Sequence, residues 1–151
     1  MNEIKIEIQI LEKKKEKLLL EKEKNILKII ECNKAITEYK ALYKEILWLL
    51  VLNTHQSEII REIVATNSNR IFNIKNITCQ AVKRKKHKLE KEASKLINKG
   101  AHIQNKISIK EREKKKINTK IFYIDKELTE INNKLFIINS KKQKKLRRKR
   151  T

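Results

Sequence analysis

The stretch that decides the fold is residues 89–138, LEKEASKLINKGAHIQNKISIKEREKKKINTKIFYIDKELTEINNKLFII. Counted from Leu89 in alternating steps of four and three residues, twelve of fifteen positions up to Ile138 are apolar. The same count from Ile4 to Leu50 finds eleven apolar residues at fourteen positions. Composition alone would give about six in each set, because 39% of the chain is apolar. This heptad repeat predicts two helices that pair along a coiled-coil seam.

The segment between the two repeats predicts a hairpin tip. Residues 66–77 are rich in Asn, with Ser among them, and these side chains bond to nearby backbone in place of a continued helix. An antiparallel hairpin pairs residues whose numbers add to a constant, and a constant of 142 to 143 aligns both repeats around Ile71. The facing pairs in this register include Ile36 with Ile107, Tyr43 with Gly100, and Leu18 with Ile124.

We therefore expect an all-α protein, a long antiparallel two-helix coiled-coil hairpin that occupies residues 1–151 as a single domain. Helix one is expected at about 2–65, the tip at about 66–77, helix two at about 78–146 and a basic tail at 141–151. One Gly and no Pro favour few, long elements. The polar segment from Asn53 to Ser57 allows a kink in helix one, with Ser57 as the N-cap of a resumed segment.

The net charge of +21 on 18.1 kDa favours an elongated body or an acidic partner, because like charges repel. Lys far outnumbers Arg, and Asn and Ile are abundant, which is also what AT-rich coding produces. The charge by itself therefore names no partner.

Catalysis and metal binding have no support in the sequence. A single Gly excludes a phosphate-cradling loop, and no group of Ser, His and Asp or pair of carboxylates stands in a pocket-forming pattern. His55, His87 and His102 lack the spacing of metal ligands. We expect no enzyme, no catalytic residue, no metal and no cofactor.

The cysteines and the apolar runs bear on the compartment. Cys32 and Cys79 have no partner cysteines nearby, which favours a reducing compartment and a packing role. The longest apolar run, residues 46–52, is too short to span a bilayer, and the N-terminus lacks a signal-peptide pattern. A cytoplasmic protein is expected.

Several apolar residues fall outside the seam. They are Trp48, Val51 and Leu52 in helix one and Phe122 and Phe136 in helix two. A broad helix face or a kink could bury them within the chain, or a partner or a second copy could cover them.

The expected tip is also apolar in part, with Ile71, Phe72 and Ile74 in an otherwise polar segment. These residues either cap the end of the seam or form a docking patch for a partner. We interpret them as a docking patch for a partner.

Two basic clusters, residues 83–88 and 141–150, stand apart from the seam. The second cluster includes Lys144, Lys145, Arg147, Arg148 and Arg150. Such runs neutralise phosphates, act as a nuclear import signal, contact an acidic membrane or protein surface, or remain a solvated tail. No aromatic residues are interleaved with them, which gives little support to specific single-strand recognition.

From Ile4 to Leu146 the chain resembles the central-stalk proteins of type III secretion systems, the flagellar FliJ type and the virulence-system YscO and InvI types. The resemblance rests on length, basic character, the single hairpin and the scarcity of Gly and Pro. The segment NTHQSEIIREI at residues 53–63 is loosely similar to the corresponding stretch of the InvI type. The cationic final segment matches no motif of the family.

The resemblance implies a cytoplasmic stalk whose paired terminal helices enter a hexameric secretion ATPase at the inner face of the membrane-bound export apparatus. It also implies contacts with the export gate and with export chaperones. The residues that would hold the ring-side end together are Ile4, Ile8, Leu135 and Ile138, while the tip around Ile71 and Phe72 would face the gate.

Two other functions remain open. The basic clusters also fit a coiled-coil nucleic-acid-binding protein. The outward apolar residues also fit a coiled-coil adaptor or scaffold that associates with itself through Trp48, Phe122 and Phe136.

Overall fold

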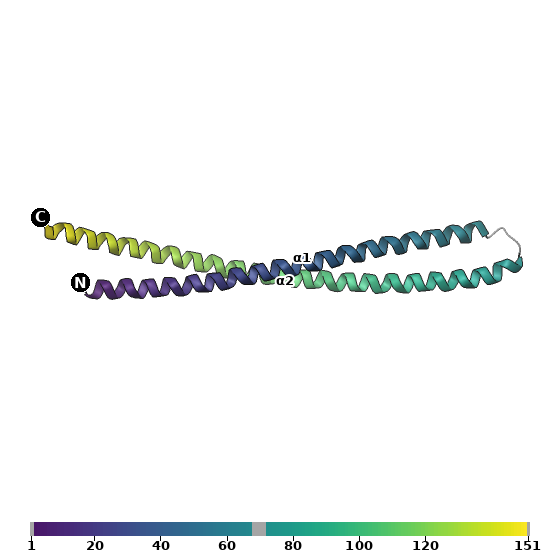
Figure 1. Ribbon diagram of the computed structural model, residues 1–151, viewed down its shortest axis with the longest axis horizontal. Coiled ribbons are helices and arrows are strands. Elements are labelled where there is room, and N and C mark those ends of the chain that lie inside the picture. Colours follow the sequence, from purple (N-terminus) through teal and green to yellow (C-terminus); the bar gives the residue numbers. More distant parts are fainter. Residues whose placement is uncertain (1, 68–71, 151) are drawn as a thin grey trace. The chain divides into compact units, whose positions relative to one another are not determined.

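The chain forms two long helices that pack against each other as an antiparallel hairpin. The computed structural model describes residues 2–67 and 72–150, and the side chains of residues 2–65 and 80–149. Helix α1 (Asn2–Asn67) and helix α2 (Phe72–Arg150) run in opposite directions (Figure 1). The expected all-α helical hairpin is thus confirmed.

The helix ends differ from the expected ones. Helix α2 begins at Phe72, before the expected residue 78, and it ends at Arg150, beyond the expected residue 146. Neither Gly nor Pro occurs near these ends, and an Asn in a helix costs only about 0.5 kcal/mol relative to Ala. Lys and Arg are good helix formers, and their charge is favourable beside the carbonyl end of a helix. Helix α2 therefore continues where Asn and the basic residues were expected to end it.

Helix α1 passes through residues 53–57 without a break, so the expected second piece that would start at Ser57 does not exist. The hydroxyl of Thr54 donates a hydrogen bond to the carbonyl of Leu50, at 2.9 Å. The Asn53 side-chain amide donates to the carbonyl of Leu89 on α2, at 3.0 Å. Asn53 thus finds an acceptor on the facing helix and Thr54 one within its own helix, so neither residue interrupts α1.

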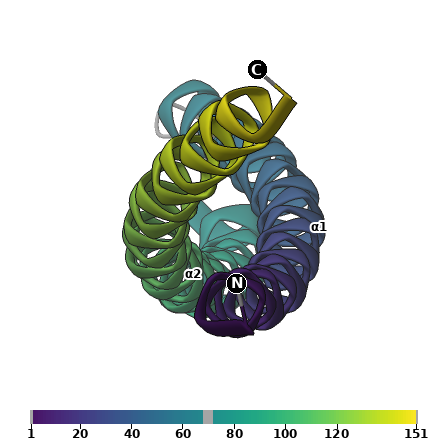
Figure 2. The same ribbon diagram turned by 90° about the vertical axis from the view of Figure 1, so that its left-hand side faces the viewer.

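The chain forms two compact units, and each contains a part of both helices. Unit 1 comprises Met1–Lys34 and Glu111–Thr151, and unit 2 comprises Ala35–Lys110. In unit 1, the segments of α1 and α2 wind around each other (Figure 2). A repeat of 3.5 residues requires this winding, because a straight helix with 3.6 residues per turn would carry its apolar stripe away from the partner.

The core of unit 1 is a short row of apolar contacts. Cys32, Ile124, Leu128 and Ile131 are buried there. Each aliphatic side chain of this kind contributes about 2 kcal/mol when it is buried. At one end of the row, the thiol of Cys32 donates to the Glu113 carboxylate at 3.9 Å, a long contact suited to a weak sulfur donor.

The core of unit 2 continues the same pattern with Ile36, Ile46, Ile60 and Leu89. Gly100 is also buried, and a Cβ atom at this position would lie 3.5 Å from the Tyr43 ring. The sequence register pairs the same two residues. It also pairs Asn53 with Leu89, whose numbers add to 142 and which are joined by a hydrogen bond.

The heptad count agrees with burial at every position. Each of the fourteen positions from Ile4 to Leu50 and of the fifteen from Leu89 to Ile138 is buried or half-buried. This includes polar seam residues such as Lys15, Lys22 and Lys114, whose long stems can cover the seam while the ammonium group reaches water. The alternation also continues past Leu50 through Asn53, Ser57 and Ile60, none of which is exposed.

Candidate functional site

The predicted seam residues lie where the two helices meet. Ile36, Gly100 and Ile124 are buried, and Tyr43 and Ile107 are half-buried. Their role is to hold the helices together, so any binding surface must be sought on the outside of the hairpin.

The outside exposes many large apolar side chains, and most of them belong to α1. Within residues 2–65 and 80–149, sixteen such side chains lie on α1 and seven on α2. Isolated exposed apolar residues are ordinary in soluble proteins, whereas clusters of them mark interaction sites. Helix α1 carries them on several sides, which is a pattern expected of a helix with more than one neighbour.

The hairpin does not bury the outward apolar residues that the sequence singled out. Trp48 is 64% exposed, Val51 57%, Leu52 42%, Phe122 65% and Phe136 73%. The expectation that a broad helix face covers them is therefore wrong for these five. Helix α1 runs through this region without a break, and Trp48 and Val51 stay exposed in it.

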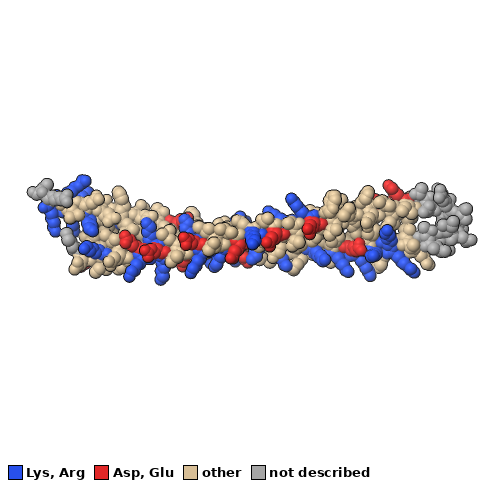
Figure 3. Space-filling view, viewed as in Figure 1, with Lys and Arg blue, Asp and Glu red and all other residues tan. Residues whose placement is uncertain are grey.

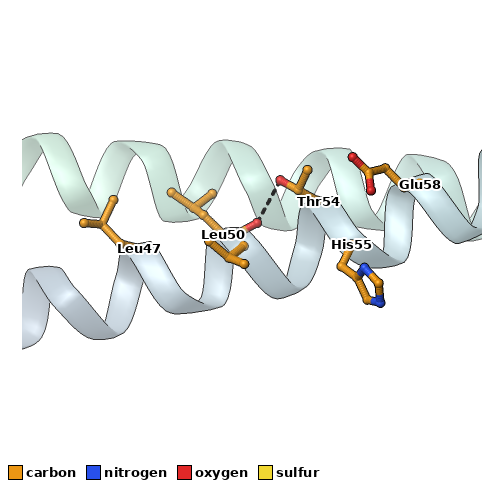
Figure 4. A pocket seen from close by; sticks show the side chains of 6 residues that line it. Leu47, Leu50, Thr54, His55 and Glu58 are labelled. Atoms are coloured by element: carbon orange, nitrogen blue, oxygen red, sulfur yellow. Dashed lines mark hydrogen bonds between the residues drawn. The ribbon is translucent and has the colours of Figure 1, made fainter.

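One side of α1 in unit 2 has a shallow hollow between successive turns. Val51 is one of its lining residues. Leu47 lies toward one end of the hollow and Thr54, His55 and Glu58 toward the other (Figure 4). The end formed by Leu47 and Val51 is apolar, and at the other end the Thr54 hydroxyl donates its hydrogen bond to the Leu50 carbonyl. Only α1 lines this hollow.

The aromatic residues of α2 form a second exposed group, in unit 1. The rings of Phe122 and Tyr123 meet edge to face, with centroids 5.8 Å apart and planes at 74°. Phe136 lies fourteen positions after Phe122, which is two heptads, so the two phenylalanines share one side of α2. These rings contact little of their own chain and offer flat apolar area to a partner.

Almost all of the net charge belongs to α2. Helix α1 contains 12 Lys and Arg and 11 Asp and Glu, whereas α2 contains 26 and 7. The two helices therefore carry formal charges of +1 and +19. Over unit 2, Figure 3 shows Lys and Arg mainly along α2 and mostly uncharged surface along α1.

The two basic clusters both lie on α2. Residues 83–88 are exposed in unit 2. Lys144, Lys145, Arg147 and Arg148 are exposed on the last turns of the helix, and the side chain of Arg150 is outside the described ones. The second cluster is thus helical, where a solvated tail was one of the expectations.

The predicted docking patch at the tip falls largely outside the described residues. Ile71 is not described, and although Phe72 and Ile74 belong to α2, their side chains are not described.

The described residues contain no group of three or more His, Cys, Asp or Glu that could hold a metal ion. Among the same residues, no helix has a stretch that is long and apolar enough to cross a bilayer.

Comparison of the chain with family models, with curated proteins and with solved structures finds no significant match.

One feature of α1 was missed in the sequence because the outward residues were considered singly. Leu49, Leu52, Gln56, Ile59 and Ile63 follow one another in steps of three and four, so they form a second heptad row beside the first. The four apolar members of this row are between 41% and 47% exposed. A count started at each exposed apolar residue, as well as at Ile4, would have found it.

Proposed function

We propose that this chain is a non-enzymatic helical hairpin that acts by binding other proteins. More specifically, we propose a stalk or coupling protein of a type III secretion apparatus, which inserts into the hexameric secretion ATPase and links it to the export gate and to chaperones. The observation that carries the general proposal is the unequal outer surface, in which α1 exposes sixteen large apolar side chains that no part of the described hairpin covers.

The exposed apolar surface of α1 is unfavourable in water. Each of these Leu and Ile side chains is about half exposed and so forgoes about 1 kcal/mol of burial free energy, which a partner recovers on binding. The seam is complete without these residues, since all its positions from Ile4 to Leu50 and from Leu89 to Ile138 are at least half-buried. The outer residues are therefore free to serve contacts with other chains.

The specific proposal of a secretion stalk adds the resemblance in length, basic character and hairpin architecture. In this proposal the protein is cytoplasmic and works at the inner face of the export apparatus. The N-terminal end of α1 and the C-terminal end of α2 both belong to unit 1, and in this proposal they would enter the ATPase ring (Figure 1).

The test is to mix the chain with a purified hexameric secretion ATPase. Retention of the chain is measured by pull-down, and its effect on the enzyme is measured as the ATPase rate. We expect the chain to be retained and the rate to change. A triple variant, Trp48→Ser, Phe122→Ser and Phe136→Ser, should lose retention while keeping its helix content, whereas Lys126→Asp on the outer face of α2 should bind normally. No retention and an unchanged rate with the unaltered chain would remove the stalk from consideration.

A second candidate function, nucleic-acid binding, is favoured by the formal charge of +19 on α2. A row of cations on one helix releases counterions from phosphates, so affinity should fall steeply with salt. Deletion of residues 141–151 should weaken binding to duplex DNA or RNA and make its salt dependence shallower. Negligible binding at low salt would exclude this candidate.

A further inference from the structure

A groove between α1 and α2 lies in unit 2, and the helical positions of its α1 residues place it on the side of α1 opposite the hollow lined by Leu47 and Val51. It has a volume of about 290 Å³ and is lined by Gln56, Ile59, Ile60, Ile63, Ala81, Val82 and Lys85. Ile60 is buried at its floor, while Ile59 and Ile63 remain more than 40% exposed along its wall. The groove therefore combines an apolar wall from α1 with a lysine from α2.

The second heptad row continues the apolar wall of this groove along α1. Ile59, Gln56 and Ile63 line the groove, and Leu52 and Leu49 extend the row in steps of three and four residues. A flat surface needs no such spacing, but a helix that packs along α1 does, because its own side chains must enter the gaps at each turn. The spacing thus fits a helix as the occupant.

The α2 edge of the groove is basic. Lys85 lines the groove, and Lys88, Lys95 and Lys99 occupy heptad positions on the same side of α2, with Glu92 among them. All four lysines are exposed, and within the described part of the chain none of them forms an ion pair. The next lysine on this side, Lys106, lies with its ammonium 5.7 Å from the centroid of the Tyr39 ring in the α1 seam.

We propose that this groove, formed by Leu49, Leu52, Gln56, Ile59 and Ile63 on α1 and by Lys85, Lys88 and Lys95 on α2, binds an acidic amphipathic helix of another protein. The apolar stripe of that helix packs along the α1 row, and its carboxylates face the α2 lysines. The row from Leu49 to Ile63 spans about 21 Å, which corresponds to about fifteen residues of the partner. The inference rests on the proposed protein-binding function and specifies the chemistry of one partner.

Charge decides between this occupant and a second copy of the chain. A second copy would bring either its α2, with 26 basic and 7 acidic residues, or its α1, in which charges are balanced, against a basic edge. Neither complements the lysines. Nucleic acid would complement them, but it has no apolar stripe to cover the α1 row.

The test uses the full chain and a synthetic peptide of about eighteen residues, or five helical turns, with Leu at the two seam positions of each heptad and Glu elsewhere. Two peptides serve as controls. One replaces every Glu with Lys, and the other scrambles the Leu positions at the same charge. Fluorescence anisotropy of the labelled peptides should show the Leu and Glu peptide binding at least about tenfold more tightly than either control, a difference of about 1.4 kcal/mol.

Variants on the two sides of α1 provide a matched comparison. Leu52→Asp with Ile59→Asp alters the groove, and Leu47→Asp with Val51→Asp alters the opposite hollow with the same change of charge. We expect only the first pair to reduce peptide affinity about tenfold or more. Lys85→Glu with Lys88→Glu leaves the apolar row intact and should reduce peptide affinity by a similar factor. This second variant keeps the proposal testable if Leu52→Asp with Ile59→Asp loses helix content.

Three results would overturn the inference. Equal affinity for the Glu peptide and the scrambled peptide would show that only net charge matters. An equal loss of peptide affinity in Leu52→Asp with Ile59→Asp and in Leu47→Asp with Val51→Asp would show that the groove is not the binding site. A concentration-dependent dimer in sedimentation that Leu52→Asp with Ile59→Asp dissolves, without peptide binding, would assign the groove to a second copy.

The outcome is separable from that of the secretion ATPase assay. Peptide binding without ATPase retention would support the groove and remove the stalk proposal. The opposite result is that the chain and its groove variants are retained equally by the ATPase and that the peptide does not bind. That result would support the stalk proposal and remove the groove.

Discussion

Helices α1 and α2 are alike where they face each other and unlike where they face outward. Both present a heptad row whose positions are buried or half-buried throughout. Their outer faces differ, because α1 has balanced charge and many exposed apolar residues, whereas α2 has an excess of nineteen positive charges. The pairing constrains only two of every seven positions on each helix, and the other five are free to serve other contacts.

The outer surfaces of the two helices therefore suit two different kinds of contact. The neutral apolar surface of α1 suits burial against protein, and the basic surface of α2 suits attraction of acidic groups at longer range. Both surfaces meet at the groove in unit 2, and the partner proposed for it would contact both. Substitutions can test each half of the contrast.

The largest effect is expected from a charge placed on an inner face. Ile124→Asp buries a carboxylate in a position that is 8% exposed, opposite apolar residues, and should lower the free energy of unfolding by about 4 kcal/mol. Lys126→Asp, two residues away on the exposed face of α2, should change it by less than about 0.5 kcal/mol. Urea unfolding followed by circular dichroism measures both. Equal midpoints for the two variants would contradict the division into inner and outer faces.

The inner face of α2 contains the only glycine of the chain, and Gly100→Ala should stabilise the hairpin by about 0.5–1 kcal/mol. The added Cβ would meet the Tyr43 ring at 3.5 Å and Ile46 at 3.6 Å, which are ordinary contacts. Gly100→Leu, in contrast, would force the Tyr43 ring out of the seam and destabilise the protein. Thermal unfolding of both variants checks the fit, and a lower melting temperature for the alanine variant would show that the seam is tighter here than described.

A Lys→Glu substitution should change the stability of the protein in opposite directions on the outer faces of α1 and α2. Lys91, Lys95 and Lys99 stand four residues apart on α2, and like charges at this spacing destabilise a helix by about 0.2–0.5 kcal/mol per pair. Lys95→Glu should therefore stabilise the protein. On α1, Lys34 stands between Glu31 and Glu38, so Lys34→Glu should destabilise it by a similar amount.

Melting temperatures at low salt measure this pair of variants. If both substitutions shift the temperature in the same direction, the charge contrast between the helices does not govern their stability.

The smallest effect concerns the ion pair in unit 1 between Lys22 of α1 and Asp125 of α2, with 2.6 Å between nitrogen and oxygen. The side chains are 32% and 48% exposed, so Asp125→Asn should cost only about 0.2–1 kcal/mol. Because salt screens exposed charges, the cost should shrink in high salt. Glu127→Gln is the control, and a loss in Asp125→Asn that persists at high salt would indicate a role beyond charge.

Much of this architecture could be predicted from the heptad count. Seam positions and the pairing of Tyr43 with Gly100 follow from it because a two-helix interface is periodic and a single tip position fixes its register. The polar residues at 53–57 were misinterpreted as an interruption, since a count by polarity cannot see that Asn53 has a carbonyl acceptor on the facing helix. The start of α2 at Phe72 was missed for a related reason, because Asn weakens a helix without ending it.

The candidate binding surface was predicted only in part. Trp48, Val51, Leu52, Phe122 and Phe136 were recognised as outward residues, and their exposure in the structure agrees with that placement. Whether the chain itself covers an outward residue depends on helix continuity and on side-chain positions. Neither can be obtained from the composition of the sequence. The second heptad row and the basic edge beside it became visible only when burial separated the inner from the outer residues.

The absence of any fully buried large side chain among the described residues has a consequence for hydrogen exchange. In a globular core, distant parts of the chain protect each other, and exchange of the slowest amides reports global unfolding. In a two-helix seam each residue is protected only by neighbours along the helix and across it, so stability is local, as in repeat proteins. Amides near Leu128, between buried Ile124 and Ile131, should therefore exchange far more slowly than those at residues 141–149, where every described side chain is exposed.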